Sequence, residues 1–315
     1  MLDAFKNDIW LQSREQTGYF GLATKDAYSL RRHLRGDKRH CCGYENDNQT
    51  QISDLFENGL RTHPLLDIAF EAFARAEARL GNRFIPQRSH EERLTGHLIS
   101  ELEAAIQLAG SAFQSAAQLR YQAPMALDFA YYDLSRGGKI EKQTGSDLGL
   151  ILLIDLPDRP KLVRYAAIQA KKMNPNASID KLQFDALSNQ FSKCAYYMFY
   201  DCNLDCVAPP MMMPAHELDA QKKADPSTKS FTVNTESIYN KTMPLSLWLV
   251  KMMADGKVGE ATKNLEDAVK AFRIFHEKSN ANPESNFQPT RLAMISIGKK
   301  FTVRRDLDGI AFAMA

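Results

Sequence analysis

Apolar and polar positions alternate in a way that sets the two ends of the chain apart from its middle. In the first region, residues 1–88, apolar side chains recur at helical spacing from Leu65 to Ala76, after the helix breaker Pro64. This spacing predicts a helix, and we expect the N-terminal region to be mainly helical.

The last region, residues 208–315, opens with a linker rich in turn-forming residues. Helical spacing then predicts helices over residues 238–254 and 260–278, and the string LAMISIG predicts a late strand. The C-terminal region is therefore also expected to be mainly helical.

The middle region, residues 89–207, has a different pattern. Ser89 is placed to cap a long helix over residues 90–117, and three strand-like segments follow, LDFAYYDL, GSDLGLILLIDL and KLVRYAAIQAKK. The turn-forming PDRP between the last two predicts a hairpin. Residues 179–193 then return to helical spacing, and AYYMFY predicts a buried strand. The pattern predicts an α/β domain around a mixed sheet, in the order helix, three strands, helix, strand.

The predicted hairpin brings three polar side chains together. Asp147 opens its first strand, whereas Gln169 and Lys171 stand two residues apart near the end of its second strand. Side chains alternate between the two faces of a strand, so Gln169 and Lys171 share one face. The end of the second strand lies across from the start of the first, so we expect a carboxylate, an amide and an ammonium group to converge.

Such a cluster has the chemistry of a magnesium site, because Mg²⁺ prefers oxygen ligands and keeps several waters. Asp147 supplies an anionic oxygen, and the Gln169 side chain and the Ala170 main chain supply carbonyl oxygens. Lys171 is expected to hold the attacking water and to stabilise charge on a scissile phosphate. A second carboxylate would offset the missing charge at Gln169; Glu92 in the first turn of the predicted helix is our choice, with Glu91 as its near rival.

These strings resemble the core motif of the PD-(D/E)xK, or restriction-endonuclease-like, nucleases. The motif here consists of GSD, a hairpin and then IQAKK, and it is similar to the subset of these nucleases in which Gln replaces the acidic residue before the lysine. The string EERLT resembles the opening of the first core helix in prokaryotic restriction and phage-defence members. LQFDALSNQF followed by AYYMFY resembles the helix and strand after the catalytic hairpin.

The resemblance covers residues 89–207 and implies a restriction-endonuclease-like αβββαβ core. It also implies dependence on Mg²⁺, with Mn²⁺ as a substitute, and cleavage of phosphodiester bonds. The function expected is that of an endonuclease acting on DNA in restriction or anti-phage defence, with RNA as the other candidate substrate. An alternative is a catalytically weak subunit that keeps the fold and binds nucleic acid or other proteins.

The composition limits the classes of protein to which this chain can belong but does not identify a binding partner. The net charge of +2 does not by itself indicate nucleic-acid binding, and no apolar run approaches the length needed to cross a membrane. The five cysteines include the adjacent pair Cys41 and Cys42, which does not fit a secreted disulfide framework. We therefore expect a cytoplasmic protein.

The flanking regions leave further partners open. The basic cluster Arg31, Arg32, Arg35, Lys38 and Arg39 suits either phosphate contacts or a solvated loop. An intracellular nuclease must be restrained, so we expect the flanks to serve as a sensor, a homo-oligomer interface or a docking surface for a regulatory partner protein.

Overall fold

A computed structural model provides the structure of this chain. It describes residues 63–85, 89–133, 146–174, 176–202, 209–224, 228–234, 241–272 and 291–300. Most of the first region, including the basic cluster at residues 31–39, lies outside the described residues.

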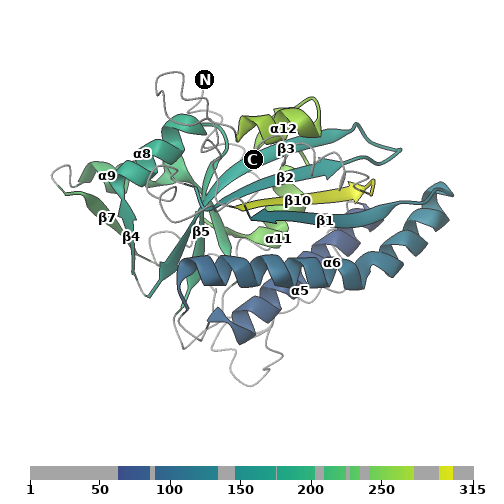
Figure 1. The fold of residues 1–315 in the computed structure, drawn as a ribbon, viewed down its shortest axis with the longest axis horizontal. Coiled ribbons are helices and arrows are strands. Elements are labelled where there is room, and N and C mark those ends of the chain that lie inside the picture. The colour runs from purple at the N-terminus through teal and green to yellow at the C-terminus, as the bar shows by residue number, and fades with distance from the viewer. Residues whose placement is uncertain are drawn as a thin grey trace, which may run out of the picture.

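The described part is a mixed α/β structure with helices on both faces of a mixed sheet (Figure 1). The order of strands in the main sheet is β1-β10-β2-β3-β5-β6-β8, and β9 pairs separately with β3. These strands are β1 (Ala126–Asp133), β2 (Leu148–Ile154), β3 (Leu162–Met173), β5 (Ala195–Asp201), β6 (Met211–Pro214), β8 (Met243–Pro244), β9 (Glu260–Thr262) and β10 (Arg291–Gly298). A separate two-stranded sheet pairs β4 (Asn176–Asp180) with β7 (Ser230–Asn234).

The helices lie on either side of this sheet. Those of the described residues are α5 (Pro64–Arg83), α6 (Glu91–Tyr121), α8 (Lys181–Gln190), the 3₁₀ turn η3 (Ala215–Leu218), α9 (Asp219–Ala224), α11 (Leu245–Leu247), the π-helical turn η4 (Trp248–Met253) and α12 (Leu265–Ala271). α5 packs on α6, which runs along the sheet beside β1, and α12 lies on the far side of the strands (Figure 1). No helix of the described residues is long and apolar enough to span a bilayer.

The predicted helix, three strands, helix and strand are confirmed as α6, β1, β2, β3, α8 and β5. β2 and β3 are both largely buried and pair antiparallel as the expected hairpin. The late strand is confirmed as β10, which lies between β1 and β2, antiparallel to the first and parallel to the second. The fold therefore has a mixed sheet, as predicted, but the first two strands of the middle region are not neighbours.

Four predictions about the elements are wrong. Residues 243–244 form strand β8, so the helix expected over residues 238–254 begins at Leu245. The described part of the C-terminal region is mixed rather than mainly helical, because it contributes β6, β8, β9 and β10 to the main sheet and β7 to the small one. Residues 260–262 form an edge strand on β3, so the helix expected from residue 260 begins at Leu265. Ser89 does not cap α6, since the residue before its first turn is His90, whose side chain makes no capping hydrogen bond.

The two faces of the sheet carry different helices, and this decides what surrounds the hairpin. Tyr165 of β3 meets Phe272 just after α12, and Tyr197 of β5 stacks on Phe184 of α8. On the other face, the Tyr200 hydroxyl is 3.1 Å from the Thr95 hydroxyl of α6. β3 therefore runs between α8 and α12 on one side and α6 on the other.

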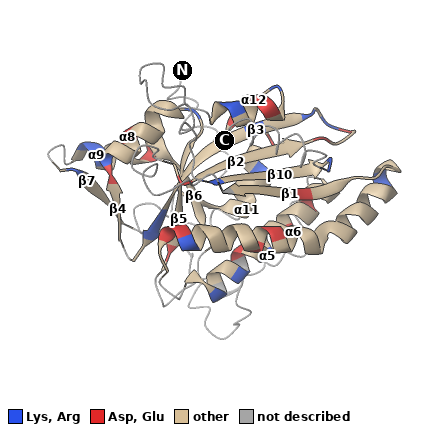
Figure 2. Ribbon diagram, in the orientation of Figure 1, with Lys and Arg blue, Asp and Glu red and all other residues tan. Residues whose placement is uncertain are grey.

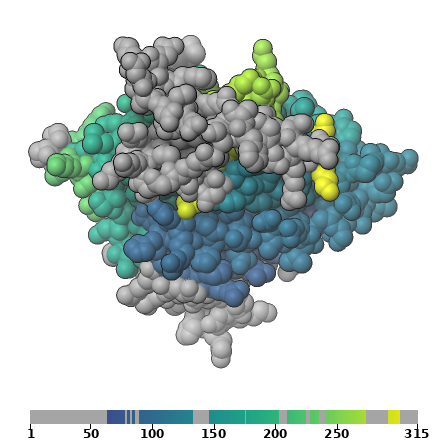
Figure 3. Space-filling model, viewed as in Figure 1, coloured from purple at the N-terminus to yellow at the C-terminus, as the bar shows by residue number. Residues whose placement is uncertain are grey.

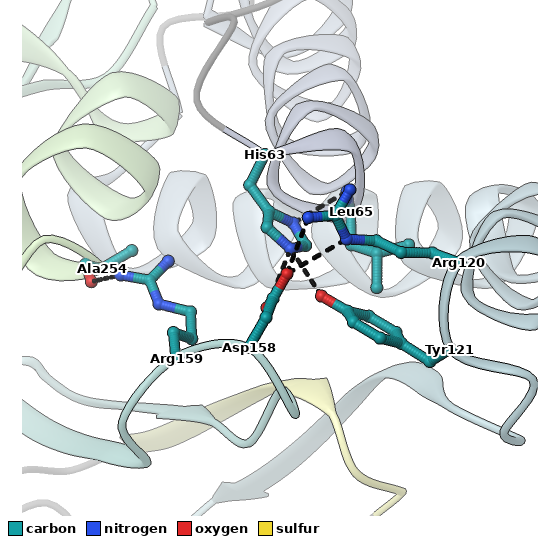
Figure 4. A network of polar contacts seen from close by, with 7 residues as sticks. All are labelled: His63, Leu65, Arg120, Tyr121, Asp158, Arg159 and Ala254. Carbon is teal, nitrogen blue, oxygen red and sulfur yellow. Dashed lines mark hydrogen bonds and ion pairs between the residues drawn. The ribbon is translucent and has the colours of Figure 1, made fainter.

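The turn of the hairpin is fastened to α5 and α6 by a polar network (Figure 4). Asp158 accepts two hydrogen bonds from the Arg120 guanidinium, at 3.1 and 2.7 Å, and lies 3.3 Å from Nε2 of His63. The same His63 nitrogen is 2.8 Å from the Tyr121 hydroxyl, while its Nδ1 accepts from the Leu65 amide at the start of α5. One end of the β2–β3 hairpin is thus anchored to both helices, which helps to hold the opposite end in place.

Candidate functional site

The end of the hairpin opposite its turn carries the predicted polar cluster. β2 and β3 pair with Leu148 opposite Ile168, so Asp147 lies across from Gln169. The Asp147 amide donates to the Ile168 carbonyl at 2.9 Å, which continues the strand pairing by one residue. The backbone therefore fixes the side chain of Asp147 beside that of Gln169.

The Asp147 carboxylate is held by two hydrogen bonds at one oxygen. Gln169 Nε2 donates to Asp147 Oδ2 at 2.6 Å, and the Ala170 amide donates to the same atom at 2.9 Å. Gln169 Nε2 also lies 3.3 Å from the Ala170 carbonyl oxygen. The carboxylate, amide and main-chain groups identified in the sequence thus lie in direct contact.

Lys171 lies on the same face of β3 and is largely buried. Its Nζ is 3.7 Å from Oε2 of Glu91 and 3.5 Å from Oε1 of Gln183. Glu91 is the first residue of α6, whereas Gln183 is in the first turn of α8. The ammonium group is therefore positioned by side chains from two helices that pack on different faces of the sheet.

Of the two candidate helix carboxylates, the structure brings Glu91 to the cluster. Glu91 Oε1 accepts a hydrogen bond of 3.0 Å from the Lys172 amide, and Oε2 faces Lys171. Glu92 is the next residue along α6, and its side chain is exposed. A helix turns by about 100° per residue, so only one of two neighbouring side chains can point at the end of β3.

Burial determines the electrostatics of Asp147. Removal from water raises the pKa of this carboxyl group from 3.8 to about 6, and the nearby Glu91 carboxylate adds to the effect. The Ala170 amide, the Lys171 ammonium and the Gln169 amide act in the opposite direction and only partly offset it. The site thus holds a carboxylate that costs free energy to ionise without a further cation.

Two residues of this neighbourhood were missed in the sequence. Gln183 could have been found from the helix start, because Asp180 caps α8 by accepting from the Gln183 amide and so places it in the first turn. Tyr197 pairs with Gln169 across β3 and β5, and its buried hydroxyl has no hydrogen-bond partner among the described residues. The alternation in AYYMFY separates Tyr197 from Tyr196, but only the register of β3 with β5 shows that Tyr197 lies on the face of Gln169.

The chemistry of these donors suits a hard cation. Within the described ranges, no three His, Cys, Asp or Glu side chains are grouped to hold a metal ion. Mg²⁺ requires only one or two carboxylates and keeps several of its waters, so Asp147 and Glu91 with the carbonyl oxygens of Gln169 and Ala170 fit it. The Gln169 amide would have to turn its oxygen rather than its nitrogen toward Asp147, which is a rotation about one side-chain bond.

The cysteines of the described residues, Cys194 and Cys202, are free and belong to no group there that could hold a metal ion. Cys202 is buried, and its thiol lies 3.6 Å from the Tyr200 carbonyl oxygen. His40, Cys41, Cys42 and Cys206 lie outside the described residues.

Comparison with known proteins supplies no family for this chain. No family model, curated protein or solved structure matches it.

Proposed function

We propose that this protein is a metal-dependent nuclease that hydrolyses phosphodiester bonds in DNA. The observation that carries the proposal is the convergence of Asp147, Gln169, Lys171 and Glu91 where the ends of β2 and β3 meet the start of α6. The order α6, β1, β2, β3, α8, β5 is consistent with a restriction-endonuclease-like core of the PD-(D/E)xK type with Gln in place of the second acid. In this interpretation β10 is an additional strand inserted between β1 and β2.

The cation-binding part of the proposed site consists of oxygen donors from three elements. Asp147 and Glu91 supply carboxylates, and Gln169 and Ala170 supply carbonyl oxygens. We assign the site to Mg²⁺, with Mn²⁺ as a substitute. When bound, the ion would polarise the phosphoryl group and lower the pKa of a bound water.

Lys171 is the cationic group of the proposed reaction. Its Nζ lies between Glu91 and Gln183, so the side chain is held in one place before substrate arrives. From there the ammonium group binds a non-bridging oxygen of the scissile phosphate and stabilises the charge that develops during attack by water. Because the donors are already placed, little reorganisation is needed at the moment of reaction.

DNA is the proposed substrate, and restriction or anti-phage defence is the proposed setting, because of the resemblance to that group of nucleases. Fold alone does not determine function, so both rest on the motif residues and their arrangement. We also infer that the purified chain requires a second copy or a regulatory partner protein for full activity, because a nuclease must be restrained inside a cell.

The test is incubation of supercoiled plasmid with Mg²⁺, Mn²⁺ or EDTA. We expect nicking that requires the metal and is lost in Lys171→Ala. The matched control is Lys161→Ala, which removes an exposed lysine at the other end of the β2–β3 hairpin. Nicking that survives in Lys171→Ala refutes the proposed site, and binding of DNA without cleavage favours the non-catalytic subunit. RNA run in parallel distinguishes a ribonuclease.

A further inference from the structure

The two-stranded sheet of β4 and β7 stands apart from the main sheet. Together with α8 and α9 it forms one end of the molecule, at the left of Figure 1 and of the space-filling view in Figure 3. The strands pair antiparallel over five residues each, with Asn176 opposite Asn234, Ser178 opposite Thr232 and Asp180 opposite Ser230. We refer to this pair of strands as the ribbon.

One face of the ribbon is a small core. Ala177 and Ile179 of β4 and Phe231 and Val233 of β7 are buried, and the Phe231 ring contacts the Phe184 ring of α8 edge-on. An isolated pair of strands is only marginally stable in water, so this apolar face and the helices behind it hold the ribbon together. The shape of the ribbon is therefore fixed from behind.

The opposite face is polar but almost uncharged. Its exposed positions are Asn176, Ser178, Ser230, Thr232 and Asn234. Asp180 shares this face, but its carboxylate is occupied by the Gln183 amide at the start of α8. Exposed strands usually carry charged side chains, especially Lys, that prevent unwanted pairing. A surface of short amide and hydroxyl groups instead offers donors and acceptors to a partner.

Positive charge flanks this neutral face at both ends. At one end the main chains of Lys181 and Lys229 extend the strand pairing through a 3.0 Å hydrogen bond, and Lys229 is exposed. At the other end Lys172, which is partly exposed, belongs to the last residues of β3, which leads into β4. Figure 2 shows further lysines on α9, next to β7. The arrangement is a neutral hydrogen-bonding strip with cations beyond each end.

We propose that the ribbon docks in the major groove of duplex DNA and presents its Asn, Ser and Thr side chains to the edges of the bases. The inference rests on the proposed nuclease function and assigns the substrate as double-stranded. Five residues at about 3.4 Å each give a strip of about 17 Å, and the major groove, about 12 Å wide, admits a two-stranded ribbon. The flanking lysines then face the two phosphate backbones that border the groove. Asn pairs with adenine through two hydrogen bonds, and the hydroxyl groups of Ser and Thr can bind either donor or acceptor groups on the base edges.

The ribbon is also well placed to deliver a phosphate to the site. Asn176 follows Met173, the last residue of β3, after only two intervening residues, and Lys171 and Gln169 lie on that strand. A duplex held on the ribbon therefore has its backbone close to the end of β3.

The experiment is a binding titration in EDTA, so that recognition is scored without cleavage. A fluorescent DNA duplex of mixed sequence, about three helical turns long, is titrated with Lys171→Ala protein carrying, in addition, Ser178→Glu and Thr232→Glu. The matched control carries Gln114→Glu and Gln118→Glu on the exposed side of α6, which changes the net charge equally. We expect the ribbon pair to weaken duplex binding by about tenfold or more and the control by less than about twofold, because only the former places negative charge in the groove.

A reciprocal variant tests the sign of the effect. Ser178→Lys with Thr232→Lys is expected to tighten duplex binding, because it adds two phosphate contacts, and to steepen the dependence on salt. In a pool of randomised duplexes, Asn176→Ala with Asn234→Ala is expected to change the selected bases and to leave the salt dependence unchanged. Equal losses in the ribbon and α6 pairs, or tighter binding to single-stranded DNA or duplex RNA than to duplex DNA, would overturn the proposal. A protein that binds duplex DNA through the ribbon but does not cleave it would refute the nuclease and leave the ribbon intact.

Discussion

Replacing Asp147 by Asn should abolish activity and at the same time stabilise the protein. The side chain is buried at the start of β2, and its pKa is raised to about 6, chiefly because burial removes the carboxylate from water. Asn has the same shape, carries no charge, and keeps one oxygen to accept the hydrogen bonds of Gln169 and Ala170. The substitution therefore removes the charge and changes the packing little.

The size of the effect follows from the two pKa values. A shift from 3.8 to about 6 corresponds to about 3 kcal/mol at about 1.36 kcal/mol per pH unit. Because the folded-state pKa is the higher one, the folded state is favoured most below pH 3.8 and loses that stability as the pH rises to about 6. Above about pH 6 the ionised side chain carries the full cost, and the Asp147→Asn variant escapes it.

The assay is urea unfolding of both proteins in EDTA at about pH 4.5 and about pH 8. At the higher pH we expect Asp147→Asn to have a free energy of unfolding about 2–3 kcal/mol above that of the natural protein, and so to unfold at a higher urea concentration. At the lower pH this difference in free energy should be smaller. Added Mg²⁺ should stabilise the natural protein by mass action and leave the variant unchanged. The matched control is Asp155→Asn at the other end of the same strand, where the side chain is half-exposed and pairs with Lys161.

Two outcomes would refute this reasoning. If Asp147→Asn is less stable than the natural protein at the higher pH, the carboxylate contributes more through its hydrogen bonds than its burial costs. If Mg²⁺ stabilises the variant as much as the natural protein, the ion binds elsewhere. Either result would also remove the physical basis for a cation at the end of β2 and β3.

Four further predictions concern single groups. Metal-dependent cleavage should fall about tenfold per pH unit below about pH 6, because protons compete with the cation for Asp147, and a pH–rate profile at limiting Mg²⁺ checks this. Glu91→Gln should lower kcat/KM by about tenfold or more, whereas substitution of the exposed Glu92 by Gln should leave it unchanged. A larger loss in Glu92→Gln than in Glu91→Gln would show that Glu92 is the carboxylate of the site. Glu77→Gln should stabilise the protein by up to about 5 kcal/mol at about pH 9 and little at about pH 4. The reason is that burial raises the Glu77 pKa from 4.5 to about 8, and the hydrogen bonds from Ser246 offset this only in part; thermal unfolding at both pH values measures the difference, and equal stabilisation at both would contradict it. Asp158→Ala should cost about 1–2 kcal/mol of stability through lost hydrogen bonds, and kcat should be retained if the network at the hairpin turn is purely an anchor.

The local elements of the fold could be predicted because their signals are local. β2 and β3 are apolar runs on either side of a turn, and α6 has an apolar stripe over many turns, so periodicity alone identifies them. The antiparallel pairing follows from the short connection, since two strands joined by a tight turn form a hairpin.

The position of β10 could not be predicted in this way. Its apolar string identifies a buried strand, but nothing in the string states that it pairs between β1 and β2. A strand buried on both sides is apolar throughout and has no alternation to specify its partner. The three-residue β9 is similarly too short for any periodicity, and it exists only because β3 offers an edge to it.

The residues of the candidate site also differ in whether the sequence could predict them. Asp147, Gln169 and Lys171 are related by alternation and by the hairpin register, which the sequence contains. The choice between Glu91 and Glu92 depends on the rotational position of α6 against β3, which is set by distant contacts such as that of Thr95 with Tyr200. A shift of one residue in the start of the helix is enough to exchange the two carboxylates, so the sequence left both open.

The balance of charge at the site gives a reason for the combination of a buried acid with Gln169. Asp147 and Glu91 together carry two negative charges when ionised, and Lys171 carries one positive charge, so the cluster has one uncompensated negative charge. A divalent cation would reverse this to one net positive charge, which suits a phosphodiester with its single negative charge. An acid in place of Gln169 would instead leave the loaded site neutral. In the proposed site Gln169 would therefore bind the metal ion less tightly than an acid but attract the substrate phosphate more strongly. On this reasoning Gln169→Glu should tighten Mg²⁺ binding and raise KM for DNA, and isothermal titration with a parallel cleavage assay would measure both; unchanged Mg²⁺ affinity in Gln169→Glu would show that this side chain does not face the cation.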